Sequence, residues 1–315
     1  MFICCIIDCM ELCLIGKSIK EFRTRLHISQ EELCDDICAV SSLSRIESGQ
    51  QVPGRKLAEA LFSRMGISAP LNDVPMTLSD FKRSSLEHQM IDMAAKGDYE
   101  FLSLLEDYKN CGSNMDVFEK QFFIFFSAIY SYRQGEESEK VLEKYIEALK
   151  LTLSSFSIDL PIKARLLTRT ELMLMNNCAL ILHEMGQKEK AIRLMEYLKN
   201  HFEENFIDQE EKARSFPVVL FNLANWKGQT GFFEEALELS CKGIDVCVEY
   251  GKLFYFAEHI FNKAYSLAKL GRAEEAVEAF NSAFTVMEAS KRAEMAKRLK
   301  NQVEEDFGSG FFGKN

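Results

Sequence analysis

Three segments of this chain align with one another without a gap, and this internal repeat limits the possible folds more than any other feature. They begin at Asn177, Asn222 and Asn262 and read NCALILHEMGQKEKAI, NLANWKGQTGFFEEAL and NKAYSLAKLGRAEEAV. In each segment an Ala follows the Asn by two residues, a Gly follows it by nine, and a second Ala follows the Gly by five. Small Ala residues let antiparallel helices approach and a Gly turns the chain between them, so the pattern predicts stacked helical hairpins.

A fourth, weaker copy of the repeat precedes these three in the segment FSAIYSYRQG, where Ala128 stands seven residues before Gly135. The turn glycines, Gly135, Gly186, Gly231 and Gly271, are then 51, 45 and 40 residues apart. These units are longer than the tetratricopeptide unit of about 34 residues, but their Ala and Gly positions resemble it. The resemblance implies four or five units stacked into a right-handed solenoid with a concave face.

The composition agrees with a helical chain. Only five of the 315 residues are proline, and Leu, Glu, Lys and Ala are abundant. The net charge of −10 is unevenly distributed, because residues 14–66 contain eight basic and seven acidic residues while the remainder is acidic. The N-terminal part could therefore bind a polyanion if its basic residues share a face, whereas the acidic body alone would not.

Residues 15–49, IGKSIKEFRTRLHISQEELCDDICAVSSLSRIESG, predict three short helices. Apolar residues at helical spacing mark the first helix. Ser29 and Glu32 form a capping box that predicts a second helix from Gln30 to about Ile37. After a break at residues 38–39, a third helix runs over about residues 41–48, and a fourth over about 55–65 closes the bundle. Two short helices joined by a tight turn are typical of domains that insert the second helix into the DNA major groove.

The pattern SQEEL followed by SSLSRIESG resembles the Xre/Cro-like family of helix-turn-helix repressors over about fifty residues. The resemblance implies that Gln30 contacts backbone phosphate and supports the recognition helix. It implies groove-facing positions for Val40, Ser41, Ser44 and Arg45, of which Arg45 is the best candidate for reading guanine. Three alternatives stay open: Val40 packs in the core, Ser41 caps the helix, or Arg45 forms a solvated salt bridge.

The same resemblance implies a structural pair, in which Arg23 of the first helix bridges to Glu47 at the end of the recognition helix. The turn Ile37-Cys38-Ala39-Val40 is shorter than in the commonest family pattern. The assignment of individual base contacts is correspondingly open.

An Asn at the same place in three repeats does not follow from packing, because Asn is a poor helix former. In tetratricopeptide units this position faces the concave groove, and an amide can bond a peptide backbone in bidentate fashion. We therefore predict that Asn177, Asn222 and Asn262 form a ladder for an extended peptide; the alternative is that they bond across neighbouring helices. By the same helical projection, further groove candidates are Asn176, Asn225, Glu184, Gln229, Tyr265 and Lys269.

Together these features predict an all-α fold, with an N-terminal five-helix-type helix-turn-helix bundle followed by a tetratricopeptide-like right-handed α-solenoid. The expected parts are an extension at 1–13 with Met10 as a possible alternative start, a DNA-binding domain at 14–66, and a linker at 67–77. They continue with a repeat domain for ligand sensing and dimerisation at 78–306 and a tail at 307–315. The tail carries two Phe residues that are expected to be exposed.

This pairing of an Xre-like domain with a solenoid resembles the Rgg and PlcR group, the peptide-pheromone regulators of Gram-positive bacteria. The resemblance implies a cytoplasmic homodimer that binds double-stranded promoter DNA and a short signalling peptide used in quorum sensing. Two other functions remain open. The repeats could serve only to dimerise or bind a protein partner, or the chain could be a repeat scaffold or phosphatase-like signalling protein without DNA binding.

Several other classes are disfavoured. The chain has no Gly-rich phosphate loop and no HExxH motif, so we expect neither an enzyme nor a cofactor. The ten cysteines form no CxxC pair and are interpreted as reduced core residues, although Cys34 and Cys38, one helical turn apart, leave a metal or redox site conceivable. The apolar N-terminus lacks a basic region, which argues against a signal peptide. The block FFIFFSAIYSY is too short to span a membrane and predicts a buried helix.

Overall fold

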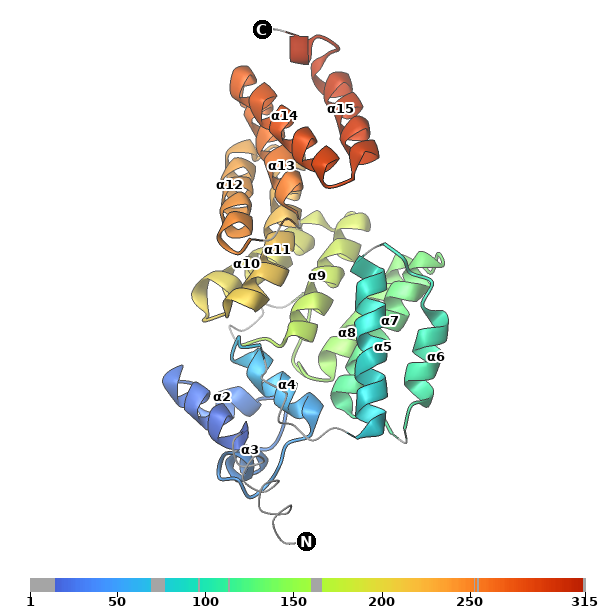
Figure 1. The fold of residues 1–315 in the computed structure, drawn as a ribbon, viewed down its shortest axis with the longest axis vertical. Helices are drawn as coiled ribbons and strands as arrows, with labels where there is room; N and C mark the ends of the chain where they lie inside the picture. Colours follow the sequence, from blue (N-terminus) through green and yellow to red (C-terminus); the bar gives the residue numbers. More distant parts are fainter. Residues whose placement is uncertain are drawn as a thin grey trace. The chain divides into compact units, whose positions relative to one another are not determined.

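The computed structural model describes residues 15–68, 77–95, 97–112, 114–159, 166–251, 253 and 255–313 (Figure 1). These residues form helices joined by short turns, and none of them lies in a β-strand, so the predicted all-α class is confirmed for this part of the chain. A first helical segment covers residues 15–25. The α-helices after it are α2 (Gln30–Cys34), α3 (Val40–Glu47), α4 (Arg55–Arg64), α5 (Leu78–Ala95), α6 (Leu102–Asn110), α7 (Val117–Arg133), α8 (Ser138–Lys150), α9 (Arg169–Glu184), α10 (Lys188–Glu204), α11 (Gln209–Gln229), α12 (Phe233–Glu249), α13 (Phe256–Lys269), α14 (Ala273–Ala289) and α15 (Ala293–Phe307).

The chain folds as two compact units, Met1–Asp208 and Gln209–Asn315. The first contains the N-terminal bundle and helices α5 to α10, and the second contains α11 to α15. The predicted extension at 1–13, with Met10, lies outside the described residues, as does most of the predicted linker at 67–77. The domain boundaries drawn from the sequence therefore stay predictions.

The N-terminal bundle has its own apolar core. Ile19 of the first helix, Leu33 of α2, Leu43 and Ile46 of α3 and Phe62 of α4 are each fully buried in it. All of these positions follow the helical spacing of apolar residues along the sequence. The core therefore places the four helices of this bundle at fixed positions around α3.

Helical hairpins make up the rest of both units, as the repeat predicts. Contacts join α7 to α8 and α9 to α10 in the first unit, and α11 to α12 and α13 to α14 in the second. The turn in each hairpin contains one of the predicted glycines in the left-handed region, with φ between 78° and 89°. The Ala residues seven before each of these glycines, Ala128, Ala179, Ala224 and Ala264, are buried. Close helix packing and the turn conformation thus account for the recurring Ala and Gly.

The predicted buried helix in the FFIFFSAIYSY block is α7. Phe122, Phe125 and Phe126 on this helix are buried, and the Phe126 ring contacts the rings of the other two. Among the described residues, no helix combines the length and apolar character needed to cross a membrane.

The expectation that the two Phe residues of the C-terminal tail are exposed is wrong. Phe311 and Phe312 are partly buried, because a short 3₁₀ turn, Phe311–Gly313, folds them back onto the second unit. Their rings each lie 6.0 Å from the ring of Phe280, and Phe311 also lies 5.0 Å from that of Phe307. The tail thus extends the core of α13 to α15, since aromatic rings are stabilised by burial and by edge-to-face contact.

Candidate nucleic-acid interface and repeat-domain site

The helix before the turn is shorter than predicted. The Ser29 and Glu32 capping box is present, with a 3.1 Å bond from the Glu32 amide to Ser29 Oγ and a 2.7 Å return bond from the Ser29 amide to Glu32 Oε2. The bond from the Ser29 amide, with support from the Ser29 hydroxyl, stabilises the Glu32 carboxylate and lowers its pKa. However, α2 ends at Cys34 rather than near Ile37, because Asp36 takes a left-handed backbone conformation (φ 58°). The turn before α3 is therefore longer than the sequence indicated.

The recognition helix α3 has one buried face and one exposed face. Leu43 and Ile46 are fully buried, whereas the four predicted groove-facing residues, Val40, Ser41, Ser44 and Arg45, are exposed. The core alternative for Val40 therefore does not describe this structure, in which the side chain is 38% exposed. Ser41 does not cap α3 either, because the helix begins one residue earlier, with Ala39 as its N-cap. In the described part of the chain Arg45 forms no ion pair, so its guanidinium is available to a ligand.

Glu47, at the C-terminal end of α3, connects the recognition helix to both helices before it. Arg23 donates through Nε to Glu47 Oε1 (2.6 Å) and through Nη2 to Oε2 (2.9 Å), and Gln30 Nε2 donates to Oε2 (2.8 Å). Burial disfavours the Glu47 charge, but the hydrogen bonds from Arg23 and Gln30 outweigh this cost and lower the pKa of Glu47. The pKa of Arg23 is raised, chiefly by its hydrogen bond to Glu47. Bidentate geometry of this kind fixes orientation as well as charge, so the pair and Gln30 set the position of α3.

Sequence reasoning missed Gly16, on which the position of α3 also depends. A Cβ atom at this position would lie 1.9 Å from the Ile46 carbonyl oxygen. The first helix therefore crosses α3 with its backbone in direct contact. A Gly inside an apolar helical pattern was the available signal, because it marks a close backbone approach.

The first helix also presents basic residues that the sequence analysis did not single out. Lys17, Lys20 and Arg25, together with Glu21 and Thr24, line an open depression of about 640 Å³. These three cations and Arg45 give the N-terminal bundle exposed positive charge, which attracts a polyanion regardless of sequence.

The predicted ladder residues are divided between the two units. Asn177 lies on α9 in the first unit, where its Nδ2 donates to the Met173 carbonyl of its own helix (2.9 Å). Asn222 on α11 is buried in the second unit. Asn262 on α13 is half-buried, and its Nδ2 is shielded from solvent without a hydrogen-bond partner in the described structure.

The remaining groove candidates interact mainly with near neighbours. Glu184 accepts hydrogen bonds from the Tyr132 hydroxyl and from Ser138 Oγ (3.3 Å), within the first unit. Asn176 is half-buried on α9. Gln229 and Asn225 bond one another along α11 (3.4 Å).

At the C-terminal end of the second unit, two candidates contact α15. Tyr265 donates to Asp306 Oδ2 (3.1 Å), and burial together with the Asp306 charge raises the pKa of Tyr265 to about 12. The Lys269 ammonium lies 4.6 Å from the centre of the Phe307 ring. These two side chains therefore join α13 to α15 in this structure and would have to change partners to contact a ligand.

Cys34, Cys38, Cys111, Cys178 and Cys241 form no disulfide in the described part of the chain. Burial raises the pKa of Cys38 to about 11, which makes it a poor metal ligand and a slow nucleophile. No group of three His, Cys, Asp or Glu side chains within the described ranges is arranged to bind a metal ion.

The fold and the exposed face of α3 define a helix-turn-helix protein with a tetratricopeptide-like repeat body. Residues 19–71 match the helix-turn-helix family HTH_3. No curated protein matches the chain. The expected helix-turn-helix domain is thus confirmed for this part of the chain.

Two solved proteins share this architecture along nearly their whole length. PlcR of Bacillus thuringiensis, in complex with the peptide PapR7 and DNA, has a TM-score of 0.61 and 19% identity, covering 90% of this chain and 98% of PlcR. The apo form of the competence regulator ComR from Streptococcus vestibularis has a TM-score of 0.54 and 20% identity, covering 94% of this chain and 99% of ComR. At such identities the shared property is the fold, and the expected resemblance to the PlcR type of fold is confirmed. These matches are to regulators rather than to enzymes.

Proposed function

We propose that this chain is a sequence-specific transcription regulator that reads double-stranded DNA with α3. The observation that carries the proposal is the exposed face of α3, where Val40, Ser41, Ser44 and Arg45 lie together on a helix whose opposite face is buried. Arg45 pairs with the O6 and N7 acceptors of guanine, Val40 contacts a thymine methyl group, and the two serines bond base edges or phosphate.

In this proposal Gln30 and the cations of the first helix position the domain rather than read bases. Gln30 already donates to Glu47 through Nε2, so its amide oxygen stays fixed near the start of α2. Lys17, Lys20 and Arg25 supply charge contacts to phosphates, which give affinity without sequence information.

DNA reading is tested by selecting binding sites from a random duplex library with the purified full-length chain. Arg45→Ala is expected to lose about 10- to 100-fold in affinity for the enriched duplex and to relax one guanine position. Arg298→Ala on α15 removes an exposed Arg far along the chain from α3 and is expected to bind like wild type. Enrichment of no duplex by the wild-type chain would contradict the proposal, and equal losses in both variants would mean that only net charge matters.

The repeat domain, residues 78–306, binds a short signalling peptide in this proposal, with Asn177, Asn222 and Asn262 as backbone contacts. The supporting observation is Asn262, whose buried Nδ2 has no hydrogen-bond partner in the described structure. An unsatisfied buried donor costs about 1–3 kcal/mol, so an Asn kept here reduces stability unless something binds it. A peptide carbonyl would satisfy this donor. To bond a peptide carbonyl in the same way, Asn177 would have to release the Met173 carbonyl, and the buried Asn222 would have to become accessible.

Peptide binding is tested with peptide fractions of medium conditioned by the producing cells. Trp226, the single tryptophan, is buried on α11 between Asn225 and Gln229 and reports changes there by its fluorescence. Asn262→Ala is expected to abolish the peptide-dependent change, whereas Asn281→Ala, an exposed Asn on α14, leaves it intact. A full response in Asn262→Ala would rule out the ladder and favour the alternative that these Asn residues serve the helix interfaces.

The same proposal places the chain in the cytoplasm as a homodimer that binds two half-sites about 34 Å apart, or a multiple of that spacing. Peptide acts by population shift, since it can change DNA binding only as far as its affinities for two arrangements differ. Sedimentation equilibrium of the wild-type chain is expected to give twice the mass of the 36.1 kDa chain. A monomer that still enriches a single half-site would instead support a regulator without a dimeric operator.

A further inference from the structure

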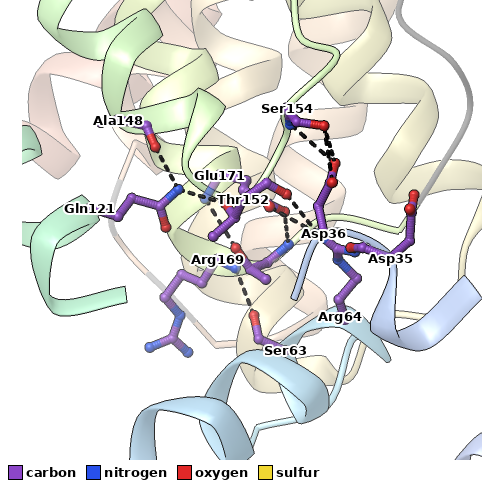
Figure 2. Close-up of polar contacts among 11 residues, drawn as sticks. Asp35, Asp36, Ser63, Arg64, Gln121, Ala148, Thr152, Ser154, Arg169 and Glu171 are labelled. Carbon is purple, nitrogen blue, oxygen red and sulfur yellow. Dashed lines mark hydrogen bonds and ion pairs between the residues drawn. The ribbon is translucent and has the colours of Figure 1, made fainter. Parts of the chain in front are cut away.

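Arg64, at the C-terminal end of α4, joins the helix-turn-helix bundle to the helices that follow it in the first unit (Figure 2). Its side chain is 1% exposed. Nη1 donates to the Asp35 carbonyl at the end of α2 (2.5 Å), and Nη2 donates to Glu171 Oε1 on α9 (3.0 Å) and to the Thr152 carbonyl after α8 (3.4 Å). Glu171 is itself fully buried. One guanidinium thus connects α2, α8 and α9.

Two further pairs flank this ion pair, as Figure 2 shows. The Arg169 amide donates to Ser63 Oγ (2.6 Å), and the Ser154 amide and hydroxyl donate to the Asp36 carboxylate (both 3.0 Å). We call these six residues the domain seat: Asp36, Ser63 and Arg64 of the bundle, and Ser154, Arg169 and Glu171 of the body.

The domain seat leaves the DNA-reading residues uncovered. The exposed residues of α3 take no part in it, whereas the residue at its centre lies on α4, where Ala60, Leu61 and Phe62 are also buried. The bundle is therefore attached to α9 and to the segment after α8 in the first unit through contacts that do not involve the exposed face of α3.

Helix α9 belongs to both the domain seat and the predicted peptide site. Glu171 closes the capping box that begins α9, with its Oε2 accepting from the Thr168 amide (2.6 Å). Asn176 and Asn177 follow five and six residues later, about 8–9 Å along the helix. A rigid helix of this length carries a displacement from one end to the other.

We infer that the Arg64–Glu171 ion pair couples the DNA-binding bundle to α9, so that the orientation of the bundle follows the state of the repeat helices. The inference rests on the proposed function for what α9 senses and what α3 reads. Two desolvated charges favour an all-or-none contact, because removing either partner leaves the other buried and uncompensated. Coupling between sites requires an element with two discrete arrangements, and the formed and broken ion pair would supply them.

The chain offers a matched pair of substitutions to test the coupling. Glu171→Gln keeps an acceptor for the capping box but removes the charge that faces Arg64. Glu119→Gln is the control, because Glu119 also closes a capping box, with Asp116, and also pairs with a buried Arg, Arg83 (2.5 Å). That second pair joins α5 to α7 and lies outside the domain seat.

The readout is hydrogen exchange of the full-length chain. Glu171→Gln is expected to speed exchange in α4 by about tenfold or more relative to α5–α7, and Glu119→Gln to show the opposite pattern. Equal exchange patterns in the two variants, or α4 unchanged in Glu171→Gln, would overturn the inference. If Glu171→Gln does not fold, Asp36→Gly removes the Ser154 bonds while keeping the left-handed backbone, and a smaller change in the same direction is expected.

A second arm uses the duplex pool that the wild-type chain enriches from a random library. Bound DNA is expected to slow exchange in residues 169–177 of α9 in wild type and in Glu119→Gln, and to lose this effect in Glu171→Gln. DNA protection confined to residues 15–68 in wild type would refute the coupling. If no duplex is enriched, the proposed DNA function fails, while the α4 comparison without DNA still decides whether the domain seat holds the bundle.

Discussion

Gly16 shows how a single residue without a side chain can determine the position of a recognition helix. Its α-carbon contacts the backbone of Ile46 on α3, and Glu47, the next residue, is bonded by Arg23 and Gln30. The reading face of α3 therefore depends on one close backbone contact and one three-residue polar cluster.

Gly16→Ala is expected to destabilise the N-terminal bundle by about 1–3 kcal/mol, because its Cβ would collide with the Ile46 carbonyl and force the two helices apart. Urea unfolding measures this loss, and DNA affinity should fall with it as α3 shifts. Gly54→Ala is the control, since a Cβ at Gly54 would meet no atom within 4 Å. A neutral effect at Gly16 would show that the helices separate without cost.

A buried imidazole in the second unit predicts a pH dependence. His259 is fully buried; its Nε2 bonds the Pro217 carbonyl (3.0 Å), and a Cβ at Gly243 would lie 2.1 Å from its ring. Desolvation disfavours the charged ring and lowers its pKa from 6.5 to about 4, although the bond to Pro217 opposes this change. The unfolded chain therefore binds the proton first as the pH falls.

Because the unfolded chain binds this proton more tightly than the folded chain, the contribution of His259 to stability is complete above pH 6.5 and is lost as the pH falls from 6.5 toward 4. The loss attributable to His259 between pH 7.5 and pH 5 is about 2 kcal/mol. Unfolding curves of wild type and His259→Gln at pH 7.5 and pH 5 measure it, and the variant is expected to show the smaller drop. His88→Gln, which removes an exposed imidazole on α5, should behave like wild type.

At the scale of elements, the hairpins could be predicted because their determinants are local. An Ala, a Gly and a second Ala at constant spacing indicate two helices and the turn between them, and the structure has hairpin turns at Gly135, Gly186, Gly231 and Gly271. The end of α2 could not be predicted in this way. It depends on Asp36, whose carboxylate bonds Ser154, 118 residues further along the chain.

The C-terminal element yields a prediction about packing. Replacing both Phe311 and Phe312 by Ala is expected to cost about 3 kcal/mol, because it uncovers Phe280, which both rings contact. Thermal or urea unfolding measures the change. Phe232→Ala is the control, since that ring is 53% exposed and its removal should cost less than about 1 kcal/mol. Similar costs for the two variants would mean that the tail is not part of the core.

At the scale of the whole molecule, the two compact units predict that a destabilising substitution in one unit speeds hydrogen exchange mainly in that unit. Hydrogen exchange of the Phe311 and Phe312 double variant is expected to rise within residues 209–313 and to change little within residues 15–68. Gly16→Ala is expected to give the reverse pattern. A uniform rise along the chain in both variants would show that the units unfold together.

The fold class, the helix-turn-helix bundle and the repeats could be predicted from the sequence. Each depends on the spacing of apolar, Ala and Gly residues that are close together along the chain. The domain seat could not be predicted from the sequence, because Arg64 and Glu171 are 107 residues apart. No local sequence pattern around either residue indicates which residue it pairs with. The available hint was the position of Arg64 itself. It lies three residues after Leu61 on the buried face of α4, where a charged residue requires a buried partner.

The domain seat also has a consequence for protein engineering. A DNA-binding domain joined to its body only by a tether could be exchanged freely between regulators to change the promoter that they control. Here a transplanted bundle would need its own equivalents of Asp36, Ser63 and Arg64, or Glu171 would be left as a buried charge without a counter-ion. Chimeras of this chain should therefore be joined within the body, after α9, and not at the linker.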